Sequence, residues 1–214
     1  MWSWSFAWSA LPLLLRALVV TVEVTLLASA LALSLGLVLA LVRRSAPRPV
    51  AVAVGAASEL IRTTPLLVQL YVLFFFLPTV GFGLSAFATG LIGLGVHYAT
   101  YTAEVYRGAI EGVPRGQWEA AVALNLSPAR TFASVILPQA IRRALPALGN
   151  YVVAMFKETP LLSAITVVEM MQAAKNLGSQ SFRYLEPITL CGLLFLLCSM
   201  PASAVVRRLE RHLE

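Results

Sequence analysis

Long apolar stretches, separated by groups of basic residues, are the feature that most constrains the fold of this chain. A helix needs roughly 20 apolar residues to cross a hydrocarbon core of about 30 Å. Of the 214 residues, 59% are hydrophobic and 12% are charged, against roughly 25% charged residues in soluble domains. We place five spans at residues 13–42, 50–77, 87–106, 144–168 and 187–206. The sequence therefore predicts an all-α integral membrane protein with five transmembrane helices, forming a single domain over residues 1–214.

The basic residues indicate how these helices are oriented. Eleven of the sixteen lysines and arginines fall into three groups: Arg43, Arg44 and Arg48; Arg107, Arg115, Arg130, Arg142 and Arg143; and Arg207, Arg208 and Arg211. Because short cytoplasmic loops of membrane proteins are rich in lysine and arginine, we expect these groups in the cytoplasm. The N-terminus is then outside and the C-terminus inside. The net charge of +6 is thus explained by topology, without nucleic acid as a partner.

The N-terminal segment resembles a signal peptide in its hydrophobicity only. Residues 1–15 contain no basic residue and the apolar stretch is too long, so we expect a retained helix. Trp2, Trp4, Phe6 and Trp8 then form an aromatic belt at the outer membrane surface. On the same side, apolar residues at near-helical spacing over 169–184 predict an interfacial helix that ends at Gly178, and a docking surface for a receptor is the alternative interpretation.

The longest soluble segment is the loop between the third and fourth spans, at about residues 107–143, which we call the coupling loop. Residues 117–124 are mostly helix formers, and Asn125 can end a helix in a left-handed conformation. Ser127 can cap the next helix, and Pro128 suits the first turn of that helix. The sequence therefore predicts a short cytoplasmic helix that ends sharply.

This short helix presents apolar side chains where no membrane covers them: Trp118, Ala120, Ala121, Leu124 and Leu126. An exposed apolar patch of this kind usually marks a protein partner. The chain has no G-x-x-x-x-G-K-[ST] loop for nucleotide binding. We therefore expect the loop to bind a separate protein.

The residue order of the coupling loop resembles that of permease subunits in ATP-binding-cassette (ABC) importers. The matching residues are Glu119, Ala120, Ala121, Asn125, Val135, Leu137 and Pro138. The preceding residues resemble the branch that imports polar amino acids: Tyr101, Glu104, Val105, Arg107, Gly108, Val113, Pro114, Gly116 and Gln117. The family usually has glycine at the position of Asn125. Because asparagine also tolerates positive φ, this difference changes the cost of the turn more than its shape.

The resemblance implies a pore subunit that is not an enzyme and binds no cofactor or metal itself. It implies two ATP-binding subunits that use the ATP, a second permease copy or a paralogue, and an extracytoplasmic solute-binding protein. The location would be the bilayer of a bacterial cytoplasmic membrane. The residues implied in coupling to the ATPase are Gly116, Glu119, Ala120, Ala121, Asn125, Leu137 and Pro138.

Two membrane segments resemble each other and indicate a substrate path. Residues 62–67 read Arg-Thr-Thr-Pro-Leu-Leu, and residues 157–162 read Lys-Glu-Thr-Pro-Leu-Leu. Each basic residue lies 12 or 13 positions into its span, or roughly 18 to 20 Å deep at about 1.5 Å per residue. Proline interrupts a helix, and interrupted helices near the middle of the membrane commonly line transport sites. Chance similarity and simple helix kinks are the alternatives.

The substrate-path candidates are Arg62, Thr63, Thr64, Glu104, Lys157, Glu158 and Thr159. Glu59 with Arg62, and Glu104 with Arg107, are each three residues apart, which also favours ion pairs along one helix face. A substrate of mixed charge fits these residues. Polar amino acids are one such class, and residues 157–162 with 182–187 resemble the permeases for ectoine and hydroxyectoine.

An ion channel or an integral membrane enzyme is the alternative class of function. A channel would work without ATP and without a bound cytoplasmic protein. A membrane enzyme needs a nucleophile and a base at one depth, and no G-x-S-x-G motif is present. We assign no catalytic residue and no metal site, since His97 has no partner at metal-ligand spacing.

Overall fold

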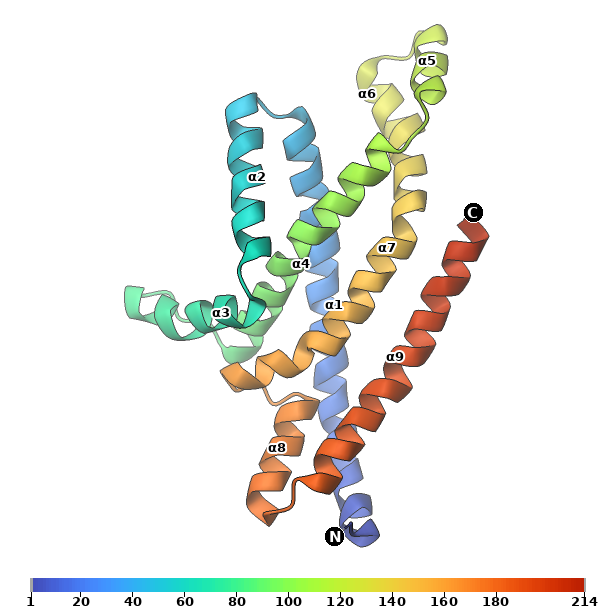
Figure 1. Cartoon of the computed structure of the whole chain (residues 1–214). Coiled ribbons are helices and arrows are strands. Elements are labelled where there is room, and N and C mark those ends of the chain that lie inside the picture. Colours follow the sequence, from blue (N-terminus) through green and yellow to red (C-terminus); the bar gives the residue numbers. More distant parts are fainter. Residues whose placement is uncertain (1, 214) are drawn as a thin grey trace.

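The computed structural model describes residues 2–213, so the ends of the expected domain, residues 1 and 214, lie outside the described range. Over that range the chain is a bundle of helices joined by short turns (Figure 1). The α-helices are α1 (Trp4–Ser45), α2 (Arg48–Thr63), α3 (Leu66–Tyr71), α4 (Ala86–Glu111), α5 (Arg115–Ala123), α6 (Pro128–Thr131), α7 (Leu137–Glu158), α8 (Met170–Ser181) and α9 (Leu185–Leu213). Two π-helical segments, η1 (Val72–Phe76) and η3 (Phe132–Ile136), and two 3-10 segments, η2 (Leu77–Val80) and η4 (Thr159–Ile165), complete the set.

The helix α1 runs through the length of the bundle and packs along α4 (Figure 1). Small residues four positions apart form the contact on each helix: Ala28, Ala32, Gly36 and Ala40 on α1, with Gly95, Ala99 and Ala103 on α4. The Thr102 hydroxyl donates a hydrogen bond to the Ala32 carbonyl oxygen over 2.7 Å. Small residues let two helix backbones approach closely, which favours association in a membrane.

The expected span 50–77 is not one helix. The helix α2 ends at Thr63, and the following helical segment, Leu66–Val80, is bent away from α2 by 102°. Pro65 has no N–H and forces Thr64 into an extended conformation (φ −99°, ψ 134°). The Gln69 side-chain amide donates to the carbonyl oxygens of Ile61 (2.6 Å) and Thr64 (3.0 Å), so it occupies backbone acceptors at the break.

The expected span 144–168 also changes conformation at its proline. The helix α7 ends at Glu158, and η4 continues as a 3-10 segment in which Pro160 is the second residue. The chain then bends by 47° into α8. Both Thr-Pro-Leu-Leu segments therefore follow the end of an α-helix, although the bend is much larger at Pro65.

The interfacial helix expected over residues 169–184 corresponds to α8, but it does not end at Gly178. It continues to Ser181, and Phe182 takes the left-handed conformation (φ 54°). Gly178 has a different role, because a Cβ atom there would overlap the ring of Tyr184. Glu169 caps the start of the helix by accepting hydrogen bonds from the backbone N–H groups of Met171 and Gln172.

By length and composition, α1 and α9 can each cross a membrane. Among the described residues the candidate spans number up to four if each bent pair counts as one span. The helix α4 has 26 residues, but polar residues such as His97 and Thr100 interrupt its apolar sequence. The all-helical membrane architecture is therefore confirmed, while the count of five spans and their orientation stay predictions.

The close contact between α1 and α4 predicts a specific sensitivity. In Gly36→Ala, the new methyl group would overlap Thr102 Oγ1 and lie 2.9 Å from the Ala99 carbonyl oxygen. Overpacking of this kind costs about 1–3 kcal/mol of stability. We expect a lower thermal unfolding temperature in detergent, measured by circular dichroism.

Gly192→Ala is the matched control, because nothing lies within 4 Å of a Cβ at this helical position. It should leave the unfolding temperature unchanged or raise it slightly, since alanine favours helix by about 1 kcal/mol. Equal unfolding temperatures for the two variants would contradict the packing described above.

Candidate functional site: a projecting short helix and a polar centre at the helix breaks

The coupling loop folds as the sequence predicts, and α5 projects from one end of the bundle (Figure 1). Asn125 has φ 54°, the left-handed conformation expected of it. The N–H of Leu126 donates to the Ala121 carbonyl oxygen over 3.0 Å, which ends the helix. Ser127 accepts a hydrogen bond from the N–H of Arg130, and Pro128 opens α6. The loop is shorter than 107–143, because α4 extends to Glu111 and α7 begins at Leu137.

The exposed face of α5 differs in part from the expected one. Ala121 is only 2% exposed and packs inward, whereas Val122 and Leu124 are 69% and 73% exposed. Gly116, Glu119 and Ala120 are exposed, as is Pro138 at the start of α7, and Leu137 is half-buried. Val122 was missed because helical spacing alone does not show which side of a short helix faces the bundle.

Apolar contacts attach the coupling loop to the bundle. Trp118 packs against a cluster formed by Ile110, Val113, Ile136 and Ala140. The Gln139 side-chain amide donates to the Gln117 side-chain oxygen over 3.0 Å. Pro138 cannot donate a backbone hydrogen bond, and the wider π-helical turn η3 ends at Ile136, two residues before it. The loop is thus held at both of its ends.

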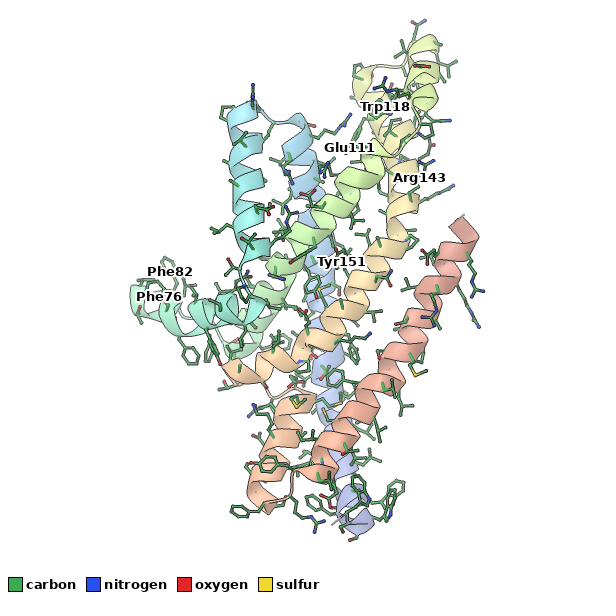
Figure 2. The ribbon with its side chains drawn as sticks, viewed as in Figure 1. Phe76, Phe82, Glu111, Trp118, Arg143 and Tyr151 are labelled. Carbon is green, nitrogen blue, oxygen red and sulfur yellow. The ribbon has the colours of Figure 1, made fainter. Side chains whose placement is uncertain are left out.

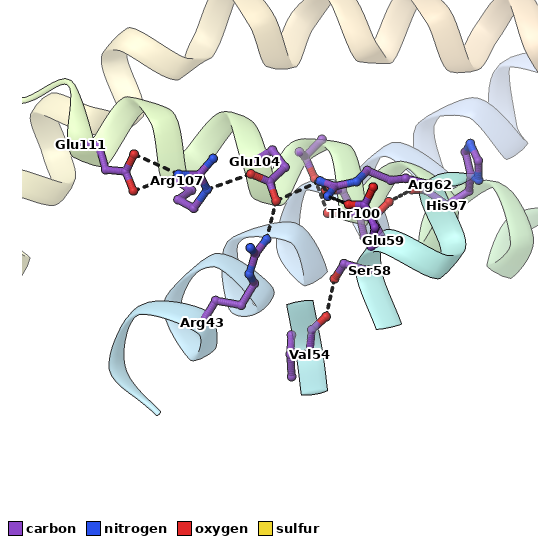
Figure 3. Close-up of polar contacts among 12 residues, drawn as sticks. Arg43, Val54, Ser58, Glu59, Arg62, His97, Thr100, Glu104, Arg107 and Glu111 are labelled. Carbon is purple, nitrogen blue, oxygen red and sulfur yellow. Dashed lines mark hydrogen bonds and ion pairs between the residues drawn. The ribbon is translucent and has the colours of Figure 1, made fainter. Parts of the chain in front are cut away.

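A cluster of ion pairs joins α1, α2 and α4 around Glu104 (Figure 3). Glu104 binds Arg62 (2.9 Å), Arg107 (2.8 Å) and Arg43. Arg107 also binds Glu111 over 2.9 Å. Hydrogen bonds to Glu104 and Glu111 raise the pKa of Arg107, which therefore stays charged. The ion pair expected between Glu104 and Arg107 is confirmed.

Arg62 is the second member of this cluster that the sequence singles out. It forms the expected ion pair with Glu59 and reaches the Thr100 carbonyl oxygen over 3.4 Å. Two of the substrate-path candidates, Arg62 and Glu104, are therefore bonded to each other. Their charges serve first to join three helices.

The threonines at the helix breaks bond to their own helices. Thr63 donates to the Glu59 carbonyl oxygen (2.9 Å) and Thr64 to that of Leu60 (2.6 Å). Thr159 is fully buried and donates to the Phe156 carbonyl oxygen over 2.8 Å. Lys157 is exposed and Glu158 half-buried, at the end of α7. Lys157 and Glu158 are the two charged candidates that lie outside the Glu104 cluster.

A cluster of tyrosines lies between the two helix breaks and was not found from the sequence. The rings of Tyr98 and Tyr101 on α4 and Tyr151 on α7 lie 5.8 to 5.9 Å apart. Tyr101 donates to the Arg62 carbonyl oxygen over 3.3 Å, and Tyr98 interacts with Glu158. The spacing of Tyr98 and Tyr101, three apart on one helix face, is the signal that could have revealed it.

His97 extends this cluster towards α3, where its Nδ1 lies 3.1 Å from the Gln69 side-chain oxygen. It is a hydrogen-bonding helix contact. Within residues 2–211, whose side chains the structure describes, no group of three or more His, Cys, Asp or Glu residues could hold a metal. Cys191 and Cys198 are both free.

The six side chains labelled in Figure 2 lie in three regions of the molecule. Trp118, Glu111 and Arg143 lie towards the end that contains the coupling loop, and Tyr151 lies in the middle of the bundle. Phe76 and Phe82 lie at the tip of the arm formed by α3, η1 and η2. The projecting helix α5 and the polar centre are thus separate regions joined by α4 and α7.

The Glu104 cluster predicts that Glu104→Gln destabilises the protein. Three arginines would face a neutral amide, and loss of hydrogen bonds to a charged group costs about 1–3 kcal/mol. We expect lower stability in a denaturant titration of the purified protein. Glu111→Gln is the control, because its side chain is 60% exposed and a surface pair contributes less than about 1 kcal/mol. A Glu104→Gln variant as stable as this control would contradict the structural role of the cluster.

Comparisons with known proteins agree with this arrangement. Residues 32–214 match the family model described as "Binding-protein-dependent transport system inner membrane component". The chain is 47% identical over 209 residues to the probable amino-acid ABC transporter permease protein y4tG of Sinorhizobium fredii, covering 98% of this chain and 90% of that protein. It is 34% identical to the glutamine transport system permease protein GlnP of Escherichia coli, covering 73% of this chain and 72% of that one.

Solved structures show the same fold. The crystal structure of an amino acid ABC transporter with histidines superposes with a TM-score of 0.93 at 32% identity, covering 99% of both chains. The MetNI methionine ABC transporter in an inward-facing conformation gives a TM-score of 0.74 at 19% identity, covering 97% of this chain and 99% of that one. These relatives are transport components rather than enzymes. The chain therefore belongs to the family of binding-protein-dependent transport system inner membrane components, in its branch of amino-acid ABC transporter permeases.

Proposed function

We propose that this chain forms half of the pore of an ATP-driven importer that brings polar amino acids into a bacterial cell. The observation that supports this most is α5, a sharply terminated helix that projects from the bundle and whose Val122 and Leu124 are exposed. Apolar side chains in water favour a protein partner. The partner is an ATP-hydrolysing subunit, since the chain has no nucleotide-binding loop of its own. An ion channel or a membrane enzyme would leave this helix unexplained.

The complete importer would contain two ATP-binding subunits, a second permease copy or a paralogue, and an extracytoplasmic solute-binding protein. In the cytoplasmic membrane the chain would cross five times, with the N-terminus outside. In this topology α2 and α7 are interrupted spans and α4 crosses despite its polar residues. Residues 1–214 would act as one permease domain.

ATP can drive the pore only if it binds one pore state more tightly than the other. When ATP binds, movement of α5, which contains Glu119, would shift the pore towards the state that ATP favours.

The polar centre at the helix breaks supports a zwitterionic solute. Lys157 can bind a carboxylate, while Glu158 and the adjacent tyrosine cluster offer negative charge and aromatic faces to an ammonium group. The relatives named for glutamine and L-cystine transport agree with this class. Thr63, Thr64 and Thr159 would shape the path through the breaks rather than bind the solute.

Ectoine and hydroxyectoine are the more specific alternative. Their case rests on residues 157–162 and on 182–187. In the second segment, Glu186 binds Arg183 and accepts a hydrogen bond from the Ser3 N–H over 2.9 Å. That segment therefore has a structural explanation that is independent of the solute, which favours polar amino acids.

The ATPase partner can be tested with Glu119→Lys. We expect co-purification of a nucleotide-binding subunit from detergent-solubilised membranes to fall at least tenfold, because a reversed charge opposes docking of α5. Glu210→Lys, an exposed charge reversal on α9, should co-purify normally. If the unaltered chain brings down no nucleotide-binding protein, the importer assignment is wrong.

The solute can be tested by uptake of radiolabelled L-glutamine, L-cystine and ectoine into cells that express the complete importer. In Lys157→Ala we expect at least a tenfold loss of uptake of the transported solute, because a hydrogen bond to a charged group contributes about 1.5–3 kcal/mol. Lys175→Ala on α8 is the control and should transport normally. Uptake of ectoine alone would reverse the preference stated here, and normal uptake by Lys157→Ala would remove Lys157 from the path.

A further inference from the structure

Arg44 lies in the last turn of α1, and its guanidinium group contacts two aromatic rings of the coupling loop. The guanidinium carbon is 5.1 Å from the ring centre of Trp118 on α5. It is 5.2 Å from the ring centre of Phe132, the first residue of η3. Both distances are within the roughly 6 Å range of a cation–π contact. One α1 side chain thus touches the loop on both sides of the turn at Asn125.

The neighbouring arginine makes a different kind of contact. Arg43 binds Glu104 and so joins α1 to α4. In the part of the chain whose side chains are described, no ion pair involves Arg44. The two arginines at the end of α1 therefore connect it to different partners, a carboxylate of the bundle and the aromatic rings of the loop.

A hollow lies beside the end of α1, and Arg44 is one of the residues that line it. Its volume is about 310 Å³, and Ala40, Arg43, Arg44, Arg107, Ile110 and Glu111 line it. The ends of α1 and α4 are therefore not tightly packed here. The Arg44 side chain both lines this hollow and contacts the rings of Trp118 and Phe132.

The outer half of α1 is attached to the helices on the opposite side of the bundle. The Met170 N–H at the start of α8 donates to Thr21 Oγ1 over 3.1 Å. The Ser3 N–H donates to Glu186 at the start of α9. With 42 residues at about 1.5 Å each, α1 is about 63 Å long. A displacement of its cytoplasmic end would therefore reach α8 and α9 through one continuous helix.

We propose that Arg44 is a positioning residue that fastens the coupling helix α5 to α1, so that movement of α5 is passed to the outer face of the permease. This proposal rests on the proposed function, because it needs an ATP-hydrolysing partner that moves α5. The planar guanidinium group suits the role, since it stacks on aromatic rings and stays charged, whereas lysine is a flexible point charge. The connection through α1 adds to the covalent ones through α4 and α7.

The experiment measures how firmly α5 follows α1 during ATP turnover. Spin labels are placed at Val38→Cys on α1 and Arg115→Cys on α5, both exposed, in a Cys191→Ala, Cys198→Ala background. The complete importer with its ATPase subunits is held in nanodiscs. Distance distributions between the labels are recorded by pulsed electron resonance with and without ATP, together with the ATP hydrolysis rate.

In the otherwise unaltered importer we expect the same narrow distribution with and without ATP. In Arg44→Ala the distribution should become at least twice as wide when ATP is present, while the ATPase subunits still co-purify and hydrolyse ATP. Arg44→Lys should give an intermediate width. Arg48→Ala, an exposed arginine at the start of α2, should match the unaltered importer.

An unchanged distribution in Arg44→Ala would overturn the proposal. Loss of the ATPase subunits from both Arg44→Ala and Arg44→Lys would also overturn it, because Arg44 would then only keep the loop folded. If Arg44→Ala alone gives no folded complex, Phe132→Leu is used instead, because it removes only one of the two rings. It should widen the distance distribution to a smaller extent. An unchanged width in Phe132→Leu would contradict the proposed role of Arg44. Failure of the unaltered chain to bind any ATPase subunit would instead refute the proposed function itself.

Discussion

The close contact between α1 and α4 is the constraint on which the rest of the structure depends. Apolar side chains gain nothing by leaving lipid for another helix, so association relies on tight packing and interhelical hydrogen bonds. Gly36 permits the backbone approach, and the bond from Thr102 to the Ala32 carbonyl oxygen secures it. The helices α2, α7, α8 and α9 then assemble against this pair. The ion pair between Arg43 and Glu104 extends the same contact towards the end of the bundle that contains the coupling loop.

The two proline breaks give this rigid pair a polar centre. A break at membrane depth exposes backbone groups that lipid cannot satisfy, so it needs protein partners. Gln69 supplies them at Pro65, and its contact with His97 ties the break to α4. The tyrosines and Glu158 complete a region where polar atoms meet between helices. Such a region suits a zwitterionic solute better than lipid, and the proposed substrate path follows from it.

Local chemistry made the coupling loop predictable from sequence. The left-handed Asn125, the cap at Ser127 and the ion pairs at spacing three depend on residues that are close in the chain. The 102° bend after Thr63 was not predictable in size, because Pro65 determines where a helix ends but not where the chain goes next. The tyrosine cluster and the contacts of Arg44 join residues far apart in sequence. Hydrophobic periodicity contains no information about such pairs.

The proposed function requires that α5 docks into an ATP-hydrolysing subunit. The most direct test places a photo-crosslinking amino acid at Val122, which is 69% exposed on α5, and at Leu197, which is 65% exposed on α9. After irradiation of living cells, the crosslinked proteins are identified by mass spectrometry. We predict that Val122 crosslinks to a protein containing a nucleotide-binding loop and that Leu197 does not. Crosslinks from Val122 that contain no such protein would contradict the docking of α5 into an ATP-hydrolysing subunit.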